Sequence, residues 1–513
     1  GRLLPAMTVT DVNALVDDLL RTDNRLVIAT MTDRPDTDEP SDADLRAMFE
    51  RAEAVVASED IQPYDDGVQD GGLVPDGLTP SSIERVEELP EADATEIVLG
   101  NGVRVRLKQT DYKTDEVVFT ATSPGGLSRV SDDEYFAGSV AAQIATQSGV
   151  AGMNQTDLDK RLWGKPVRVA PYVSGTSEGF NGSFEPSQAE TAMQLIHAYF
   201  ATPNFDAAAL GRYQAQQTAL LANLDNVPQV ALIRALTETF GGDSPRTRQF
   251  PTVAEVEALT TGELQALYLD RFADASDFLF TFVGSFDPDE MTNLARLYLG
   301  TLPTQSRDDA TLDVDPTPPD AVTLRDVYKG AAPQSTVLTV FYGPMDYAPS
   351  ERLAHQAMVE VLGIQIREDL REERGGVYSP AVQGQRDDEP TPEQQVIVQF
   401  TCDPDRAVEL ADAVIEQVQR LRDDGPSMEN MAKVKEQLRR SQETSLRTNG
   451  FWVNTLDFYG MRPSENLSNV TDFDARVAAL TATDIQQAAQ AYLDLERYAR
   501  FILYPEDRAP DGQ

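Results

Sequence analysis

The chain has 513 residues, 41% of them hydrophobic, and a formal net charge of −42 at pH 7. Its length is too great for one hydrophobic core and predicts a few domains of roughly 100–200 residues each. The acidity argues against nucleic acid as a partner, because no basic stripe is present to neutralise phosphates.

The acidic residues are spread through the chain and do not form one tail. A cationic partner would be one reason for such a surface, but we favour adaptation to high salt, where the repulsion between carboxylates is screened. A single cysteine, Cys402, excludes an internal disulfide framework. No apolar run approaches the roughly 18 residues of a membrane-spanning helix, so no membrane span is expected.

One helix–strand pattern occurs three times, at Met7–Thr30, Leu259–Gly284 and Leu480–Tyr504. In each copy a threonine stands three residues before an acidic residue, which is the spacing of a capping box at a helix start. The pairs are Thr8/Asp11, Thr260/Glu263 and Thr481/Asp484. Three such ends predict three related structural units.

The first 58 residues contain one of these units and a second helical pattern at Ser41–Val56. A segment of this size buries little core by itself. We therefore expect residues 1–58 to be the tail of an upstream domain whose body is missing. A segment rich in Asp, Gly and Pro predicts a linker at 59–90.

Two longer segments, 91–305 and 321–513, follow the same order of elements and are separated by a second linker at 306–320. Each begins with strands, the first of them a hairpin around Asn101-Gly102. A helix, a strand pair, further helices and the helix–strand unit follow. The pattern predicts an α+β fold of two tandem domains, each a mostly antiparallel sheet with helices on one face.

Three segments resemble the M16 family, the insulinase and pitrilysin zinc metallopeptidases. They are Phe278–Pro303, the LREERGGVYSP segment Leu370–Pro380, and Thr448–Gly460. The resemblance implies domains of the LuxS/MPP-like metallohydrolase type, two in each half of a clamshell that encloses the peptide. It covers the C-terminal half of a bacterial periplasmic-type member, preceded by the last piece of the N-terminal half. It implies a periplasmic or cell-envelope location, with the cytoplasm as the alternative.

The family binds zinc through an H-x-x-E-H motif on the first long helix of its N-terminal half. In this chain Val140, Gln143 and Ile144 occupy the places of His, Glu and His. The two histidines of the chain, His197 and His355, fall in different domains. We expect His197 to pack in a core and His355 to be hydrogen-bonded or solvent-facing. We therefore expect no metal and no cofactor in this chain, with zinc in the missing N-terminal half.

The resemblance also implies a catalytic pair, Arg371 and Tyr378, seven residues apart. In the family these residues hold the peptide and stabilise the tetrahedral intermediate. A guanidinium and a phenolic O–H have their largest effect on an oxyanion inside an enclosed site. The alternative is that Arg371 pairs with Glu368 at the surface and Tyr378 merely begins a strand. Further substrate-binding candidates are Arg374, Gly376 and Asn449.

These expectations favour the C-terminal half of a zinc-dependent metalloendopeptidase that degrades peptides in a closed chamber. The chain alone would then be inactive, and its partner would be an N-terminal M16 half, on the same polypeptide or on another. The alternative is a non-catalytic M16-like scaffold or peptide-binding subunit. An H-x-x-E-H upstream of Gly1 would favour the enzyme. The strand Gln395–Thr401 is a candidate edge for an added peptide strand.

Overall fold

The computed structural model describes residues 7–19, 40–58 and 72–510, together with residues 26, 28 and 30. The chain divides into two compact units, Gly1–Asp66 and Gly67–Gln513. The described part of the first unit consists mainly of helices α1 (Val9–Leu19) and α2 (Asp42–Ser58). None of the helices in the described ranges is long and apolar enough to cross a bilayer.

The capping interaction predicted for α1 is present. The backbone N–H of Asp11 donates to Oγ1 of Thr8 (3.2 Å), and the N–H of Thr8 donates to the Asp11 carboxylate (2.8 Å). These bonds satisfy amide groups that a helix start otherwise leaves without an acceptor. Most of the strand expected before Thr30 lies outside the described residues. The assignment of residues 1–58 to an upstream domain stays a prediction.

The first sheet of the second unit has seven strands in the order β1-β2-β3-β7-β4-β6-β5. They are β1 (Ile83–Leu89), β2 (Ala94–Leu99), β3 (Arg104–Gln109), β4 (Val117–Pro124), β5 (Val167–Val173), β6 (Ser177–Phe184) and β7 (Leu279–Gly284). The β3–β7 pair is parallel and the other pairs are antiparallel. The predicted hairpin joins β2 to β3, and Gly102 takes the positive φ (+92°) that its turn requires.

Strand β1 lies inside the segment predicted to be a linker, which therefore ends before Ile83 and not at residue 90. Its sequence, IERVEEL, carries four charged side chains, and all seven residues are exposed or only partly buried. An edge strand of this kind lacks the alternation of apolar and polar residues that identifies a half-buried strand.

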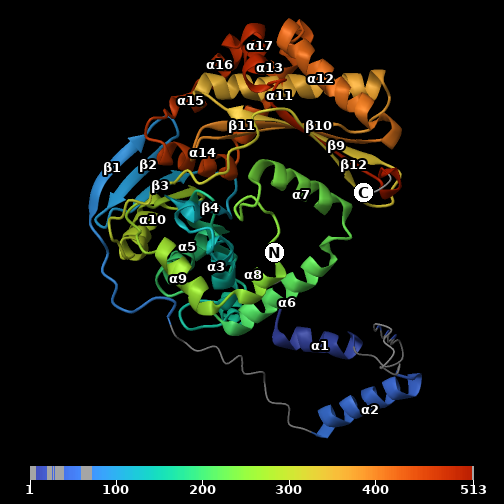
Figure 1. Cartoon of the computed structure of the whole chain (residues 1–513). Coiled ribbons are helices and arrows are strands. Elements are labelled where there is room, and N and C mark those ends of the chain that lie inside the picture. Colours follow the sequence, from blue (N-terminus) through green and yellow to red (C-terminus); the bar gives the residue numbers. More distant parts are fainter. Residues whose placement is uncertain are drawn as a thin grey trace. The chain divides into compact units, whose positions relative to one another are not determined.

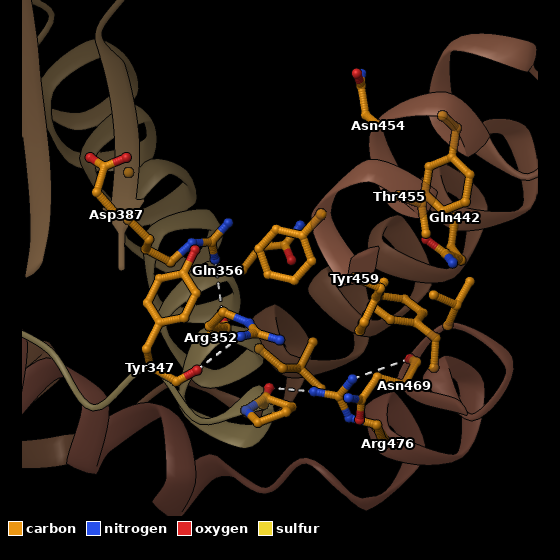
Figure 2. A pocket seen from close by; sticks show the side chains of 18 of the residues that line it. Tyr347, Arg352, Gln356, Asp387, Gln442, Asn454, Thr455, Tyr459, Asn469 and Arg476 are labelled. Atoms are coloured by element: carbon orange, nitrogen blue, oxygen red, sulfur yellow. Dashed lines mark hydrogen bonds between the residues drawn. The ribbon is translucent and has the colours of Figure 1, made fainter. Parts of the chain in front are cut away.

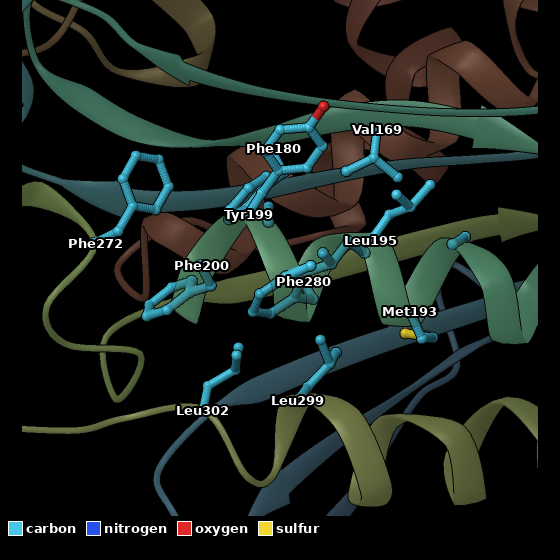
Figure 3. Close-up of a cluster of buried hydrophobic side chains, with 14 of the residues drawn as sticks. Val169, Phe180, Met193, Leu195, Tyr199, Phe200, Phe272, Phe280, Leu299 and Leu302 are labelled. Carbon is cyan, nitrogen blue, oxygen red and sulfur yellow. The ribbon is translucent and has the colours of Figure 1, made fainter. Parts of the chain in front are cut away.

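The first half of the second unit comprises the described residues before the linker at 306–320. Most of its helices form a layer on one face of the first sheet. They are α3 (Tyr135–Ser148), α4 (Gln155–Leu162), α5 (Ala189–Ala201), α6 (Ala207–Leu224), α8 (Val253–Ala258), α9 (Thr261–Arg271) and α10 (Pro288–Leu294). Figure 3 shows part of the core between the layers, where Phe180 and Phe280 of the sheet meet Phe200 of α5. The density of aromatic rings here explains why this half folds around one large core.

The second sheet has five strands in the order β10-β11-β9-β12-β8, and its β12–β8 pair is parallel. The strands are β8 (Thr323–Tyr328), β9 (Ser335–Pro344), β10 (Ala381–Asp387), β11 (Glu393–Cys402) and β12 (Tyr498–Tyr504). The helices are α11 (Pro349–Arg367), α12 (Ala407–Asp424), α13 (Met428–Ser445), α14 (Asn449–Met461), α15 (Ser468–Thr471), α16 (Phe473–Ala479) and α17 (Ala482–Tyr492). The predicted α+β class with mostly antiparallel sheets is confirmed.

The strand expected to offer a free edge is an interior strand. Residues Gln395–Thr401 belong to β11, which pairs with β10 on one side and with β9 on the other. Its backbone N–H and C=O groups are therefore occupied. Its alternating apolar residues look the same in an edge strand and in an interior strand, so the sequence did not reveal this position.

Each sheet is covered on its second face by a helix from the other half of the unit (Figure 1). Helix α14 packs on β7 and β4 of the first sheet, and α7 (Pro228–Gly241) packs on β12 and β8 of the second. The two helices occupy matching places in the chain. Helix α7 is the third α-helix after the β5–β6 pair, and α14 is the third α-helix after the β10–β11 pair. The two halves are thus joined by exchanged helices, and α14 also forms one wall of the cavity described below.

Candidate functional site

The structure brings Arg371 and Tyr378 together. Helix α11 continues into η5 (Glu368–Glu373), a π-helical turn that carries Arg371. Such turns are frequent at functional sites. The guanidinium carbon of Arg371 lies 6.0 Å from the centre of the Tyr378 ring, within the range of a cation–π contact. Arg371 is exposed, and Tyr378 is 86% exposed.

Two glycines make the turn between these side chains possible. Gly375 has a φ of +62°, a backbone conformation that disfavours other residues. The N–H of Gly376 donates to the carbonyl of Leu370 (3.1 Å). A Cβ atom at Gly376 would lie 2.6 Å from the Arg406 guanidinium and 2.9 Å from Leu410, so a larger residue would require these side chains to move. Gly376 therefore shapes the site through its backbone.

The alternative for Arg371 was a surface ion pair with Glu368, and no such pair is present among the described residues. Glu368 faces Lys433, at 3.6 Å between carboxylate and ammonium. Tyr378 does not begin a strand, since β10 starts three residues later. Among the residues that the structure describes, no hydrogen bond or ion pair occupies the Arg371 guanidinium or the Tyr378 hydroxyl. Both polar groups are therefore open to a ligand.

Arg374 is held in a different environment. Its guanidinium donates to Asp369 (3.0 Å) and to Glu416 of α12 (2.6 Å), so two carboxylates compensate its charge. These ion pairs keep the pKa of Arg374 above its usual value, with the Glu416 hydrogen bond as the main cause. Arg374 fastens the end of η5 to α12 and is less available to a substrate than Arg371.

Asn449 does not join the other candidates. It is 3% exposed at the start of α14, where its side chain accepts from Thr110 (2.6 Å) and donates to Glu116 (3.2 Å). Both partners belong to the first sheet's half. A buried amide with both of its ends bonded has no surface for a peptide, so Asn449 connects the two halves.

The three positions of the family's metal motif lie on α3. Val140 and Ile144 point into the core, 3% and 0% exposed, while Gln143 faces outward. Two of the three side chains therefore belong to the packed layer between helix and sheet. Within the described ranges, no group of three or more His, Cys, Asp or Glu side chains is placed to hold a metal ion.

The two histidines and the cysteine are buried structural groups. His197 is 5% exposed on α5, as predicted. His355 is 1% exposed, and its Nε2–H donates to Oε1 of Gln394 (3.1 Å). Burial lowers the pKa of His355 to about 4. Burial also raises the pKa of the Cys402 thiol to about 11, which makes it a poor nucleophile.

A second site is a cavity of about 820 Å³ between α11, β10 and α14 (Figure 2). Three arginines line it: Arg352, Arg386 and Arg476. Aromatic side chains complete the wall, among them Phe458 of α14 and Tyr347 of the segment between β9 and α11. The sequence analysis missed this site, because the arginines come from separate segments and no local motif joins them.

Comparison with known proteins shows similarity to a peptidase family model and to zinc proteases. A family model described as the peptidase M16 inactive domain matches residues 258–438. A zinc protease PQQL-like protein of Arabidopsis thaliana is 25% identical over 488 residues, 88% of this chain and 46% of that protein. The chain thus spans about half the length of the relatives it matches.

The fold agrees with solved structures. The periplasmic protease PqqL from Escherichia coli matches with a TM-score of 0.75 and 20% identity, over 91% of this chain and 51% of that one. The first half of the same protease matches with a TM-score of 0.64 and 13% identity, over 83% and 93%. Both TM-scores show that this chain and the two matched structures have a similar fold. Residues 258–438 of this chain thus match the inactive domain of the M16 peptidases, and the fold resembles that of the solved protease PqqL.

Proposed function

We propose that this chain is the half of a zinc-dependent M16 endopeptidase that binds the peptide without holding the metal. The observation that carries the proposal is the exposed Arg371–Tyr378 pair, whose polar ends have no hydrogen-bond or ion-pair partner among the described residues. Zinc and the general base would lie in a second M16 half, on the same polypeptide or on a separate chain. There the metal would activate the attacking water.

The chemistry of the pair suits this role. The Arg371 guanidinium would hold a peptide carbonyl, and the Tyr378 O–H would donate to the oxygen that becomes negatively charged. Such donors act most strongly when a second wall excludes water, and this chain alone offers no such enclosure at the pair, since both side chains are exposed. We therefore expect the chain by itself to cleave no peptide.

Two further parts of the proposal concern the location and the working conditions of the enzyme. Because one solved relative is a periplasmic protease, we propose a periplasmic or cell-envelope location. Because the net charge is −42, we propose that the enzyme works in high salt.

The test compares peptide cleavage by this chain alone with cleavage by the same chain joined to a zinc-binding M16 half. We expect activity only in the joined form, with loss on chelation of the metal. Tyr378→Phe removes one oxyanion donor and is expected to lower kcat about 10²–10³-fold. Tyr112→Phe, a partly exposed tyrosine of the first half, is the matched control and should have no effect.

Two outcomes would contradict the proposal. Full activity in Tyr378→Phe would remove the pair from the reaction. An absence of cleavage in the joined form would favour the second candidate, a non-catalytic scaffold or peptide-binding subunit. The fold allows that role as well, since function depends on the site and not on the architecture.

A further inference from the structure

The arginine-lined cavity is built from six elements of the second half, namely α11, β10, α13, α14, α15 and α16. Arg352 projects from α11, Arg386 from β10 and Arg476 from α16. Figure 2 shows Arg352 and Arg476 around the same space as Gln356, with Tyr459 of α14 beside them. The site is therefore part of the folded core of this half and not a chance grouping on a loop.

The positive charge in the cavity is only partly compensated. Arg352 is paired with Glu465, whose carboxylate accepts from both terminal nitrogens (2.5 and 3.0 Å). Arg386 donates to the backbone carbonyl of Arg352 (2.8 Å), and Arg476 donates to the carbonyls of Asn469 (3.2 Å) and Pro349. Those acceptors are neutral. In the described part of the chain, neither Arg386 nor Arg476 has a carboxylate within ion-pair distance.

The nearest acidic side chain in the wall does not supply the missing charge. Asp387 follows Arg386 on β10, so the two side chains point to opposite faces of the strand. Figure 2 shows Asp387 directed away from Arg352. Its pKa is raised by burial and by the neighbouring carboxylates Asp388 and Asp315, and no arginine lowers it.

Both unpaired arginines are also disfavoured by their surroundings. Burial lowers the pKa of Arg386 and of Arg476, and the charge of Arg352 also lowers both, while the carboxylates of Glu465 and Asp472 offset part of this at Arg476 only. Holding two half-buried cations beside a third costs free energy. In a chain with 85 acidic residues, a carboxylate partner for either arginine would be easy to supply. Among the described residues, the guanidinium groups of Arg386 and Arg476 instead have no carboxylate within ion-pair distance.

We infer that this cavity is a binding site for a carboxylate of a peptide, either an acidic side chain or a free C-terminus. Guanidinium groups bind carboxylates through paired hydrogen bonds, and the aromatic wall suits the apolar part of the same peptide. The assignment of the ligand as a peptide rests on the proposed function. The cavity would then select acidic peptides within a strongly acidic protein.

The test is isothermal titration calorimetry of the full chain with four N-acetylated octapeptides at one fixed salt concentration. The peptides combine one central Glu or Gln with a free or an amidated C-terminus. We expect the peptide with the preferred carboxylate to bind at least about tenfold more tightly than the neutral peptide. The Glu/Gln comparison and the acid/amide comparison show which of the two carboxylates is bound.

Two variants test the site itself. Arg386→Gln removes one unpaired guanidinium, and Gln356→Glu places a competing carboxylate in the cavity with almost no change of shape. Both should reduce the preference for the carboxylate to less than about threefold. Arg447→Gln is the control, because it removes the same charge from an exposed position on α13's C-terminal side, where Arg447 pairs with Glu443.

The inference is overturned if the neutral peptide binds as tightly as the acidic ones, or if Arg447→Gln weakens binding as much as Arg386→Gln. The experiment needs no zinc and no second half. Its failure would leave the cleavage test of Tyr378 unaffected, and failure of the cleavage test would leave a measured carboxylate site in place.

Discussion

The outer faces of the two sheets are covered by helices from matching places in the chain, but the two contacts differ in kind. Arg106 of the first sheet is buried and donates to the carbonyl of Leu456 on α14 (2.7 Å). Helix α7 meets the second sheet through apolar side chains, such as Leu232 against Phe501. The ion pair at that contact, Arg325–Glu238, is exposed.

The difference shows how charge can join two halves of a molecule. Glu96 is 4% exposed and lies within 3.1 Å of Arg85, Arg104 and Arg106. Because isolated charges are costly to bury, Arg104 and Arg106 are bonded both to Glu96 and to backbone carbonyls of α14. The contact of α14 therefore combines a buried charge network with the apolar packing of Trp452 and Leu456, whereas the contact of α7 depends mainly on apolar area.

The largest predicted effect tests this difference directly. Glu96→Gln leaves Arg106 buried without its anion and should lower the free energy of unfolding by about 3–5 kcal/mol. The matched change at the other contact, Glu238→Gln, should cost about 0–1 kcal/mol, because that pair is exposed to solvent. Urea unfolding of both variants at pH 7 measures the two losses. Equal losses would show that Glu96 does not anchor α14.

The second prediction concerns His355 of α11, in the half that contains the second sheet. Its folded-state pKa of about 4 is below the value of about 6.5 in the unfolded chain. Between these values the unfolded chain binds a proton that the folded chain does not, so stability falls as the pH is lowered through this window. One proton accounts for about 1.4 kcal/mol per pH unit, or about 3 kcal/mol over the whole window.

We expect His355→Gln to lose this contribution while keeping a side-chain donor toward Gln394. The measurement is the difference in unfolding free energy between wild type and variant from pH 8 to pH 5. A constant difference would contradict the prediction. His197→Gln gives the comparison in the first half, where burial also lowers the pKa, so the difference should change in the same direction.

The local features of the fold could be predicted from the sequence, whereas the contacts between the halves could not. The Asn101-Gly102 hairpin and the alternation in β9 and β11 depend on neighbours in the chain. The exchange of α14 depends on residues such as Arg106 and Leu456, which are 350 positions apart. The polar face of β3 looks like a solvent-facing face, because the helix that covers it is encoded elsewhere.

The candidate sites follow the same rule. Arg371 and Tyr378 could be proposed because they share one short segment, and the structure places them 6.0 Å apart. The three arginines of the cavity come from α11, β10 and α16, so only the packing of these elements brings them together. Asn449 was predicted to bind substrate because it lies in a segment that resembles the family. The sequence did not reveal that its side chain is buried.

The smallest predicted effect compares the repeated helix starts. In α17 the Thr481 hydroxyl accepts from the Asp484 N–H (3.2 Å), and the Asp484 carboxylate accepts from the Thr481 N–H (2.7 Å). In α9 the structure has the first bond, from Glu263 to Thr260 (3.3 Å), without the reciprocal one. Thr481→Ala should therefore cost about 1 kcal/mol, and Thr260→Ala somewhat less.

Thermal unfolding of the two alanine variants measures this difference, with Thr481→Ser as a control that keeps the hydroxyl and should stay close to wild type. A larger loss at Thr260 than at Thr481 would show that the reciprocal bond adds nothing. The threonine-to-acid spacing in the sequence would then predict where each helix begins, but not how much the cap stabilises it. Both threonines begin the last helix before an interior strand, so the comparison sets a complete capping box beside an incomplete one at the same place in the two halves.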